Sequence, residues 1–317
     1  MKTFWNNLKK LFFALAPIAG YTDSAMRQLC KKLGADLVFT EMISTHAVVH
    51  GNETTKKLLK YSEKERPIVV QLFGNDPVYF AKAVKIVEKL GFDGVDINMG
   101  CPARKVFKNQ SGVGLLKNKK LALEIVKATV EATKLPVSVK TRPGIDSSEG
   151  FLEFAKELEK AGIKALTIHG RTHSQRFSGP VDWDLIKKIK KELDIVVIGN
   201  GGITSAKEAK KRLEETNVDG LMIARGAIGN PWIFQEIKDY LKTGNLPKPK
   251  SSEERFKMML EHAKLAVKFK GEKRGIKEMR KHFVKYVHGL PKAREMREKL
   301  VRIKNLKELE KLLREEV

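Results

Sequence analysis

The sequence predicts an α/β protein: a (β/α)8 TIM barrel followed by a small all-helical domain at the C-terminus. Eight short apolar segments alternate with longer amphipathic segments between residue 14 and about residue 242. A stretch rich in Gly, Pro and Ser then interrupts this alternation, and the hydrophobic spacing beyond it is helical. We therefore expect a barrel domain over 1–242, a linker over 243–251 and a helical domain over 252–317.

The eight apolar segments are the expected strands. They are nearly continuous hydrophobic runs, which is typical of parallel strands buried on both faces. An open doubly wound sheet is the alternative, but it more often has about five to seven strands and an early GxGxxG fingerprint, which is missing after the first segment. In chain order the segments cover 14–20, 36–42, 67–74, 93–100, 136–142, 164–170, 194–202 and 219–226.

The segments between the strands carry apolar residues at helical spacing. Clear examples in the barrel are 78–91, 119–135, 151–162 and 205–216. In the C-terminal domain the Ser-Ser-Glu-Glu sequence at 251–254 predicts a helix start. The helical patterns that follow it cover 254–271, 275–290 and 307–317.

The chain is strongly basic. Its net charge is +24, from 62 Lys and Arg against 38 Asp and Glu, which indicates a polyanionic partner such as nucleic acid or a membrane surface. A thermophile's charged surface would explain many charges of both signs but not this positive excess. Residues 246–317 hold 22 Lys and Arg against 11 Asp and Glu, which favours a binding surface in the helical domain.

Neither a membrane anchor nor a metal centre is expected. The apolar run near the N-terminus is too short to span a bilayer and has no clear signal-peptide cleavage site, so we expect a cytoplasmic protein. The two cysteines cannot hold an iron–sulfur cluster or a zinc finger by themselves. Cys30 has the spacing of a residue on the buried face of a helix. His46 and His50 lie four residues apart, but no carboxylate or third histidine shares this spacing to complete a metal site.

Polar residues at the strand ends are the candidates for a catalytic site, because the active site of this barrel lies at the carboxyl ends of its strands. Glu41, Gln71, Asn98, Lys140, Arg142, His169, Arg171 and Asn200 all occupy such positions. Gln71, Lys140 and His169 could donate hydrogen bonds to the polar edge of a flavin. A Schiff base on Lys140, as in barrel aldolases, is an alternative that these residue types leave open.

The loops after the last two strands predict a phosphate site. In this barrel such a site is usually built there, and both loops are rich in glycine. The "NGGITS" sequence at 200–205 is expected to open a helix at Thr204 or Ser205, and "ARGAIGNP" at 224–231 adds the cation of Arg225. Glycines let the backbone approach a phosphate, although Gly201 and Gly202 could simply form a tight turn.

The chain also resembles the tRNA-dihydrouridine synthases, in their bacterial form. The most specific likeness is "VDINMGCPARKVFKNQSG" at 95–112, which surrounds Cys101. Val113 and Gly202 depart from the family, which more often has a smaller residue at the first position and, in many bacterial members, aspartate at the second. Further matching motifs, in order, are "APIAGYTD" (16–23), "FTEM" (39–42), "QLFG" (71–74), "VKTRPG" (139–144), "HGRT" (169–172), "NGGI" (200–203) and "ARGAIGNPWIF" (224–234).

This resemblance implies an oxidoreductase that reduces the C5–C6 bond of specific uridines in the D-loop of tRNA. It implies non-covalent FMN as the cofactor, NADPH as the electron source, and no metal, membrane or protein partner. Gln71, Lys140 and His169 would hold the polar edge of the flavin. The other implied cofactor residues are Ala16, Pro17 and Ile18 at the ring, and Asn200, Gly201, Gly202, Ala224 and Arg225 at the phosphate.

The resemblance also assigns the cysteine. Hydride would pass from flavin N5 to C6 of the uracil, and Cys101, a thiol on a turn between Gly100 and Pro102, would protonate C5. The implied substrate contacts are Asn98, Arg142, Arg171, Arg104 and Lys105. The basic helical domain would hold the tRNA while the uridine is flipped out of its stack.

Three other readings remain open from the residues alone. A dihydroorotate-type dehydrogenase also uses FMN and a loop acid on a pyrimidine, but its small substrate would leave the basic tail without a purpose. A catalytically silent RNA-binding protein built on a barrel would be colourless. A Schiff-base aldolase would form a borohydride-trappable adduct on Lys140.

Overall fold

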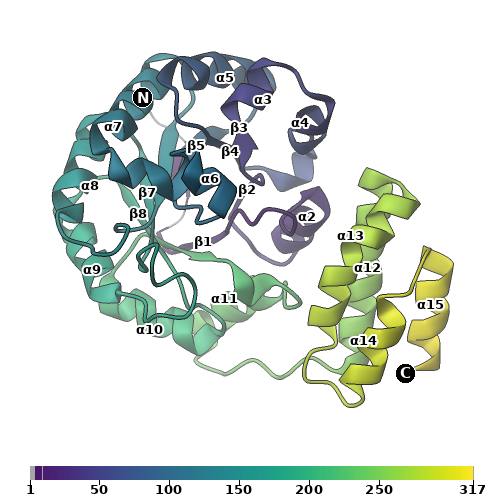
Figure 1. The fold of residues 1–317 in the computed structure, drawn as a ribbon. Coiled ribbons are helices and arrows are strands. Elements are labelled where there is room, and N and C mark those ends of the chain that lie inside the picture. Colours follow the sequence, from purple (N-terminus) through teal and green to yellow (C-terminus); the bar gives the residue numbers. More distant parts are fainter. Residues whose placement is uncertain (1–3, 9, 317) are drawn as a thin grey trace.

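The computed structural model describes residues 4–8 and 10–316, and its centre is a closed barrel of parallel strands that confirms the predicted (β/α)8 fold (Figure 1). The strands follow one another around the sheet as β2-β1-β9-β8-β7-β6-β5-β4-β3, and a further pairing between β2 and β4 closes the ring. Their bounds are β1 (Phe12–Leu15), β2 (Leu37–Phe39), β3 (Ile43–Ser44), β4 (Ile68–Phe73), β5 (Gly94–Met99), β6 (Val137–Thr141), β7 (Ala165–His169), β8 (Val196–Asn200) and β9 (Gly220–Ile223).

The second strand of the barrel is interrupted. The sequence predicts one strand over 36–42, whereas β2 ends at Phe39 and β3 begins at Ile43, and both halves pair with β4. Between them the hydroxyl of Thr40 accepts the hydrogen bond of the Gln71 N–H at 3.0 Å, so a side chain replaces the strand carbonyl there. The break also frees the carboxylate of Glu41 to accept from the Gly20 N–H.

Successive residues of each strand face opposite sides of the barrel wall, which divides the core in two. Inward-facing residues such as Ala14, Phe39 and Val69 pack together in the barrel interior with Trp5 of α1 (Phe4–Asn7). Outward-facing residues such as Val70 pack under the surrounding helices. The inward positions at the carboxyl ends of the strands therefore all open onto one mouth.

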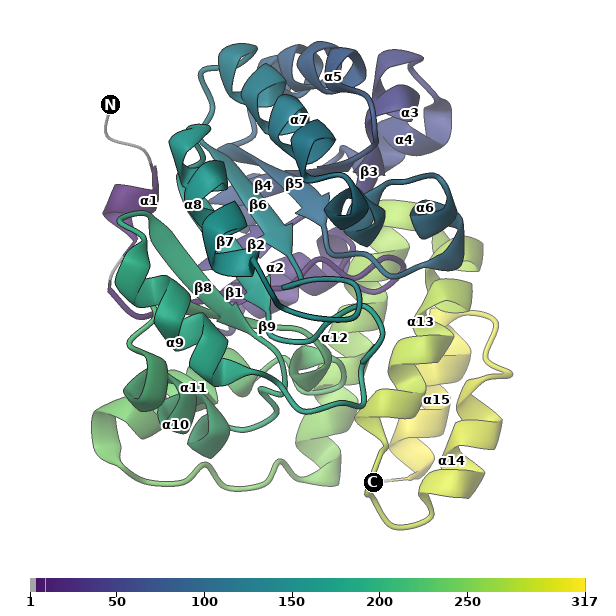
Figure 2. The same cartoon turned by 60° about the vertical axis from the view of Figure 1, so that its left-hand side comes forward.

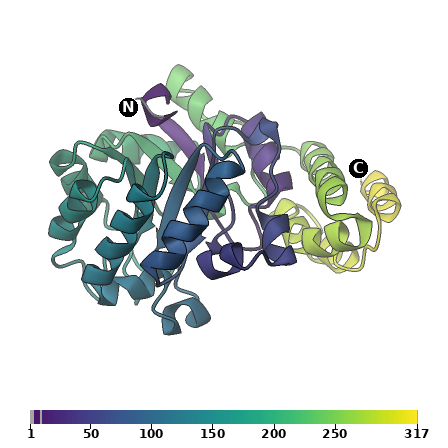
Figure 3. The ribbon, with the colours of Figure 1, turned by 90° about the horizontal axis from the view of Figure 1, so that it is seen from above.

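Helices surround the barrel (Figures 1 and 3). Their starts follow local sequence signals: Asp76 caps α5 by accepting from the N–H groups of Val78 and Tyr79, with Pro77 in the first turn. The barrel helices are α2 (Ser24–Lys32), α3 (Thr45–Val49), α4 (Glu53–Leu58), α5 (Pro77–Lys89), α7 (Lys119–Glu131), α8 (Phe151–Lys160), α9 (Trp183–Glu192), α10 (Ala206–Thr216) and α11 (Ile233–Thr243). Short helices η1 (Glu63–Glu65), α6 (Arg104–Lys108), η2 (Gly112–Lys117) and η3 (Arg225–Ala227) lie in the loops.

The C-terminal tail is a bundle of helices that packs against the barrel beside α2 (Figures 1 and 3). It consists of α12 (Ser252–Lys270), α13 (Glu272–Tyr286), α14 (Ala293–Leu300) and α15 (Leu306–Glu315). As predicted, Ser251 starts the first helix, in a reciprocal capping box with Glu254. The helix α14 was not predicted from the sequence. Between α11 and α12 the chain has no regular secondary structure.

Within residues 4–8 and 10–316, none of the helices combines the length and the apolar character that crossing a membrane requires.

Candidate active site at the barrel mouth

A cavity of about 1200 Å³ opens at the carboxyl ends of the strands and extends to the tail. Figure 2 shows the loops after β5, β6 and β7 on the side of the barrel where the tail lies. The tail and the segment before it contribute Lys248, Lys250, Arg255, Lys285 and His288 to the lining. The predicted cofactor residues, Cys101, Asn98, Arg142 and Arg171 line this cavity. Arg104 and Lys105 do not and are exposed on α6, and the strand-end candidate Glu41 also lies outside the lining, where it accepts from the Gly20 N–H.

Five polar side chains from consecutive strands form a ring at the mouth: Gln71, Asn98, Lys140, His169 and Asn200. Each occupies an inward-facing position near the end of its strand, from β4 to β8. In the parallel register Asn98 lies opposite Lys140 and His169 lies opposite Asn200, while Gln71 lies opposite Asp96. The structure therefore brings together the strand-end residues that the sequence singled out.

A chain of hydrogen bonds runs through the ring to the cysteine loop. It begins at Asp96, a fully buried carboxylate one layer below, which accepts from Ser138 Oγ at 2.6 Å and from Gln71 Nε2 at 2.8 Å. Gln71 Oε1 accepts from Asn98 Nδ2 at 2.8 Å, and Asn98 Oδ1 accepts from the Cys101 N–H at 2.9 Å. Since an ionised carboxylate can only accept, Asp96 sets the orientation of both amides.

Burial lowers the pKa of both basic groups of the ring. Burial, reinforced by the nearby Arg142, lowers the pKa of Lys140 to about 8, and Lys140 Nζ donates to Asn200 Oδ1 at 3.2 Å. Burial and the surrounding cations, Lys140 first, lower the pKa of His169 to about 2, so its imidazole is neutral. The ring can thus offer an ammonium and a neutral imidazole side by side.

Cys101 follows β5 on a turn at the edge of the cavity and is partly exposed. Its loop is tightly folded, because a Cβ added at Gly112 would lie 3.1 Å from the Cys101 Cβ. Burial raises the pKa of the thiol above its ordinary value, against the opposing effects of the Ala103 N–H, Lys140 and Arg142. The side chain is therefore a protonated thiol at neutral pH, which suits a proton donor better than a nucleophile.

Arg142 is buried where three loops meet. Its Nε donates to the Gly100 carbonyl at 3.1 Å, and its Nη1 donates at 2.8–3.1 Å to the carbonyls of Arg171, Thr172 and Arg176. The cysteine loop and the loop after β7 are joined a second time by the stacked rings of Phe107 and His173, whose centroids are 4.4 Å apart. These contacts give Arg142 a structural task, and its predicted contact with a substrate stays a prediction.

The glycine loops after β8 and β9 form a cradle. Gly201 and Gly202 have φ values of 128° and 73°, a conformation that side-chain-bearing residues rarely adopt. The two loops touch, because a Cβ at Gly226 would lie 2.3 Å from the Ile203 carbonyl oxygen. Ser205 caps α10 by accepting from the Glu208 N–H, so a helix start faces the same region, as the sequence predicted. Exposed backbone, a helix start and the Arg225 guanidinium together suit a phosphate group.

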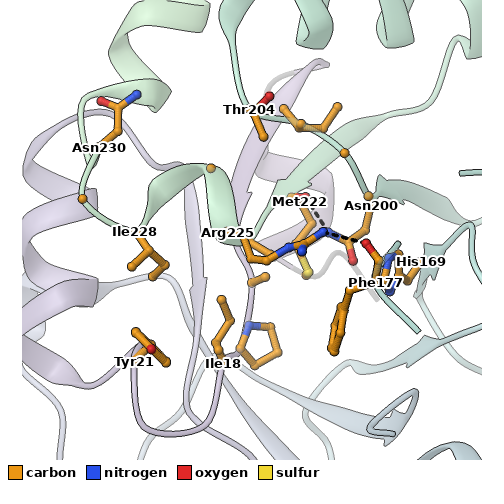
Figure 4. Close-up of a pocket in the computed structure, with 18 of the residues that line it drawn as sticks. Ile18, Tyr21, His169, Phe177, Asn200, Thr204, Met222, Arg225, Ile228 and Asn230 are labelled. Atoms are coloured by element: carbon orange, nitrogen blue, oxygen red, sulfur yellow. Dashed lines mark hydrogen bonds between the residues drawn. The ribbon is translucent and has the colours of Figure 1, made fainter. Parts of the chain in front are cut away.

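Two residues of the site were not found from the sequence. Asp96 is not among the candidates named from the sequence, although an acidic residue in an apolar run, two positions before Asn98, is a usable signal. Phe177 lies in the loop after β7, and its ring is 5.3 Å from the Arg225 guanidinium and 5.5 Å from that of Arg142. Figure 4 shows Phe177 beside His169 and Arg225, and no sequence pattern marked it.

His46 and His50 lie away from this cavity. Their rings are 4.2 Å apart, and His46 stacks on Tyr79. In the part of the chain that the structure describes, no group of three or more His, Cys, Asp or Glu side chains could hold a metal ion.

Comparisons with known proteins give consistent relatives for this chain. Residues 14–317 match the family model described as dihydrouridine synthase (Dus). The probable tRNA-dihydrouridine synthase of Rickettsia conorii is 41% identical over 285 residues, covering 89% of this chain and 86% of the relative. The tRNA-dihydrouridine synthase B of Pseudomonas aeruginosa is 40% identical over 293 residues (92% and 88%), and the probable tRNA-dihydrouridine synthase of Aquifex aeolicus is 38% identical over 315 residues (98% and 97%).

Solved structures share the barrel fold at low sequence identity. Histamine dehydrogenase from Rhizobium sp. 4-9 superposes with a TM-score of 0.55 and 16% identity, over 80% of this chain and 48% of that one. A 2-naphthoyl-CoA reductase superposes with a TM-score of 0.60 and 14% identity, over 75% and 51% of the two chains.

Proposed function

The chain belongs to the dihydrouridine synthase family, and we propose that it reduces the C5–C6 double bond of uridines in the D-loop of tRNA, with FMN as cofactor and NADPH as electron source. The family match covers almost the whole chain, and the relatives named above are matched over most of their own length. The tRNA substrate is supported by the names of these relatives, which are tRNA-dihydrouridine synthases, and by the strongly positive charge of the chain.

The residues at the barrel mouth fit FMN. Gln71, Lys140 and His169 would meet the polar edge of the ring system, and the backbone of 16–18, which lines the same cavity, would contact the rings. The glycine cradle with Asn200 and Arg225 would hold the phosphate. Bound there, FMN would supply the hydride, and the Lys140 ammonium would stabilise the negative charge of its reduced form.

The observation that carries the proposal is the position and protonation of Cys101. Its partly exposed thiol lies on the loop after β5, at the edge of the cavity that Lys140 and His169 line from within. The raised pKa keeps a proton on the sulfur, so Cys101 can protonate C5 of the uracil. The Asn98 hydrogen bond to the Cys101 N–H fixes the backbone of the loop beneath that sulfur.

The same loop carries the proposed tRNA contacts Arg104 and Lys105. Both side chains are exposed on α6, immediately beyond the cysteine, and outside the cavity. That arrangement suits contact with phosphates flanking a uridine that has been flipped into the cavity. Asn98 lines the cavity, but its amide already donates to Gln71 and accepts from the Cys101 N–H, so its contact with the base stays a prediction. Arg171 is committed in part to the Gly179 carbonyl.

The test is to incubate the FMN-loaded protein with NADPH and unmodified tRNA, and to map dihydrouridine by position. We expect product at defined D-loop uridines, and a loss of at least about 100-fold in the rate with Cys101→Ala, the scale of a general acid. Cys30→Ala is the matched control, because Cys30 is the only other cysteine and is buried in the core away from the cavity. Its activity should stay close to that of the parent protein.

Each outcome decides between the readings. No dihydrouridine, despite a bound flavin that NADPH bleaches, would contradict the tRNA substrate and return a small pyrimidine as the substrate class. Equal losses in Cys101→Ala and Cys30→Ala would contradict the role of Cys101 as the acid. Borohydride trapping of a substrate on Lys140 would favour the aldolase reading instead.

A further inference from the structure

Asp96 is a buried carboxylate to which the proposed reaction assigns no task. It lies on β5 two residues before Asn98, so its side chain points into the barrel interior, and none of its surface is exposed. The interior beside it is built from apolar residues such as Phe39, Val69 and Ile198. A carboxylate in such surroundings is costly unless hydrogen bonds or an opposite charge compensate it.

Hydrogen bonds hold Asp96 as an acceptor. Each of its two oxygens has one donor, Ser138 Oγ and Gln71 Nε2, and neither donor is charged. These bonds stabilise the ionised form, whereas burial raises the pKa of Asp96 to about 6. The carboxyl is therefore mainly ionised at neutral pH.

Lys140 is the cation whose charge acts on Asp96. Asp96 lies opposite Ser138 on the neighbouring strand and Asn98 lies opposite Lys140, so Asp96 and Lys140 are diagonal neighbours on the inner faces of β5 and β6. Four titratable groups face Lys140: Asp96 and Cys101 from β5 and its loop, Arg142 from the end of β6, and His169 from β7. Because the thiol is protonated and the imidazole neutral, Asp96 is the anion of this set at neutral pH.

We propose that Asp96 is a positioning residue for the reduction, whose buried negative charge keeps the Lys140 side chain an ammonium at the barrel mouth. Without that charge, burial and the guanidinium of Arg142 would both favour the neutral amine. Only the consequence of the inference, that the ammonium is available to the reduced flavin, rests on the proposed function. The effect of the Asp96 charge on Lys140 itself belongs to the protein without cofactor.

The test measures the titration of Lys140 in the cofactor-free protein. Competitive acetylation of lysines from pH 6 to pH 11, read by mass spectrometry on the peptide that contains Lys140, gives the pH at which its amine becomes reactive. With Asp96→Asn this midpoint should fall by about one pH unit or more, because the variant lacks the negative charge that favours the ammonium. A fall of one unit is a tenfold change in the ratio of ammonium to amine at a given pH. The matched control is Ser138→Ala, which removes a hydrogen bond to Asp96 but keeps the carboxyl. That loss raises the pKa of Asp96, yet the carboxyl should still be mostly ionised at the more alkaline pH where Lys140 titrates, so the Lys140 midpoint should move by clearly less than with Asp96→Asn.

A second variant and a second readout make the test decisive. Asp96→Ser, which also removes the charge and leaves room for water, replaces Asp96→Asn if the latter fails to fold by circular dichroism. An unchanged Lys140 midpoint in a folded variant without the Asp96 charge would overturn the inference. In the FMN-loaded protein, the alkaline limb of NADPH-driven flavin reduction should move down by the same amount. A shifted midpoint in a protein that forms no dihydrouridine would leave the inference standing and contradict the proposed function alone.

Discussion

The two cysteines differ in their surroundings, and this difference can be measured directly. Cys101 is partly exposed at the barrel mouth, whereas Cys30 lies fully buried in α2. Burial raises the pKa of both thiols, so neither is a thiolate at neutral pH. A proton donor needs this state, and a nucleophilic cysteine needs the opposite one.

We therefore predict that iodoacetamide alkylates Cys101 slowly at pH 7 in the native protein, because only the thiolate reacts. The rate should keep rising with pH beyond about 9, since the thiol loses its proton only above its raised pKa. Mass spectrometry of the two cysteine peptides gives both rates in one sample. Cys30 is the internal control and should react only after denaturation, and a Cys101 rate that levels off below pH 8 would contradict the role of acid.

At the scale of residues, the sequence located the ring but not what lies beneath it. Gln71, Asn98 and Lys140 could be found because each is a polar residue that ends an apolar run, and parallel strands end at one rim. Asp96 lies one layer lower, where its function depends on which neighbours share the barrel interior. Phe177 belongs to an irregular loop, and its position follows from contacts with the distant Arg142 and Arg225.

The loops after β5, β6 and β7 act together as one layer over the barrel mouth. The guanidinium of Arg142, from the end of β6, donates to carbonyls of both neighbouring loops. The Gly144 and Ile145 carbonyls accept from the N–H groups of His173 and Ser174, which adds a direct backbone link between two of the loops. The position of Cys101 thus depends on a side chain from the next strand.

Replacing Arg142 with Met should therefore loosen this layer. The variant keeps the apolar part of the side chain but leaves four carbonyls without their donor, and we expect a loss of about 2–3 kcal/mol in the free energy of unfolding. Urea denaturation measures the loss, and limited trypsin digestion at Arg104 and Lys105 should become faster. Arg176→Met is the matched control on the same loop, because only the backbone carbonyl of Arg176 takes part. Equal stability of the two variants would contradict the role of the Arg142 side chain in holding the three loops together.

At the scale of elements, regular repeats were predictable and local interruptions were not. The barrel strands and helices recur with one hydrophobic pattern, which made the eightfold alternation visible. The break between β2 and β3 depends on the Thr40 hydroxyl accepting from Gln71, a contact between separate strands. The helix α14 is short, and only Met296 and Leu300 of its side chains are buried, so its pattern was too weak to recognise.

The attachment of the tail to the barrel explains why α2 is buried on nearly all sides. Met26 and Cys30 pack into the core of the barrel, while Ala25 and Leu29 belong to the core of the tail. Lys270 of α12 also pairs with Asp23, the cap of α2. The sequence showed two helical segments with apolar faces, but which faces meet is decided by contacts between segments more than 200 residues apart. Because the two parts share a core, removing the tail would expose apolar surface on α2.

Charge substitutions are therefore a sharper test of tRNA binding by the tail than its deletion. Lys281 and Lys285 lie on α13, one turn apart; Lys281 Nζ is 5.2 Å from the ring centroid of Tyr21, and both Tyr21 and Lys285 line the cavity. Lys307 and Lys311 lie on α15, on the side of the tail away from the barrel (Figures 1 and 3). Changing either pair to Gln removes the same charge from the tail.

We predict that Lys281→Gln with Lys285→Gln weakens tRNA binding about 10-fold or more at low salt. The plot of log association constant against log salt concentration should also become less steep, by about 1–2 in slope. With each phosphate contact that is lost, fewer counterions are released when the tRNA binds, so affinity and salt dependence should fall together. Titrations of labelled tRNA at several salt concentrations measure both quantities, and FMN binding checks that the fold is intact. The Lys307→Gln, Lys311→Gln pair should change affinity by less than about 3-fold. Equal losses in the two pairs would mean that tRNA responds to the total charge of the tail, and that α13 does not face it.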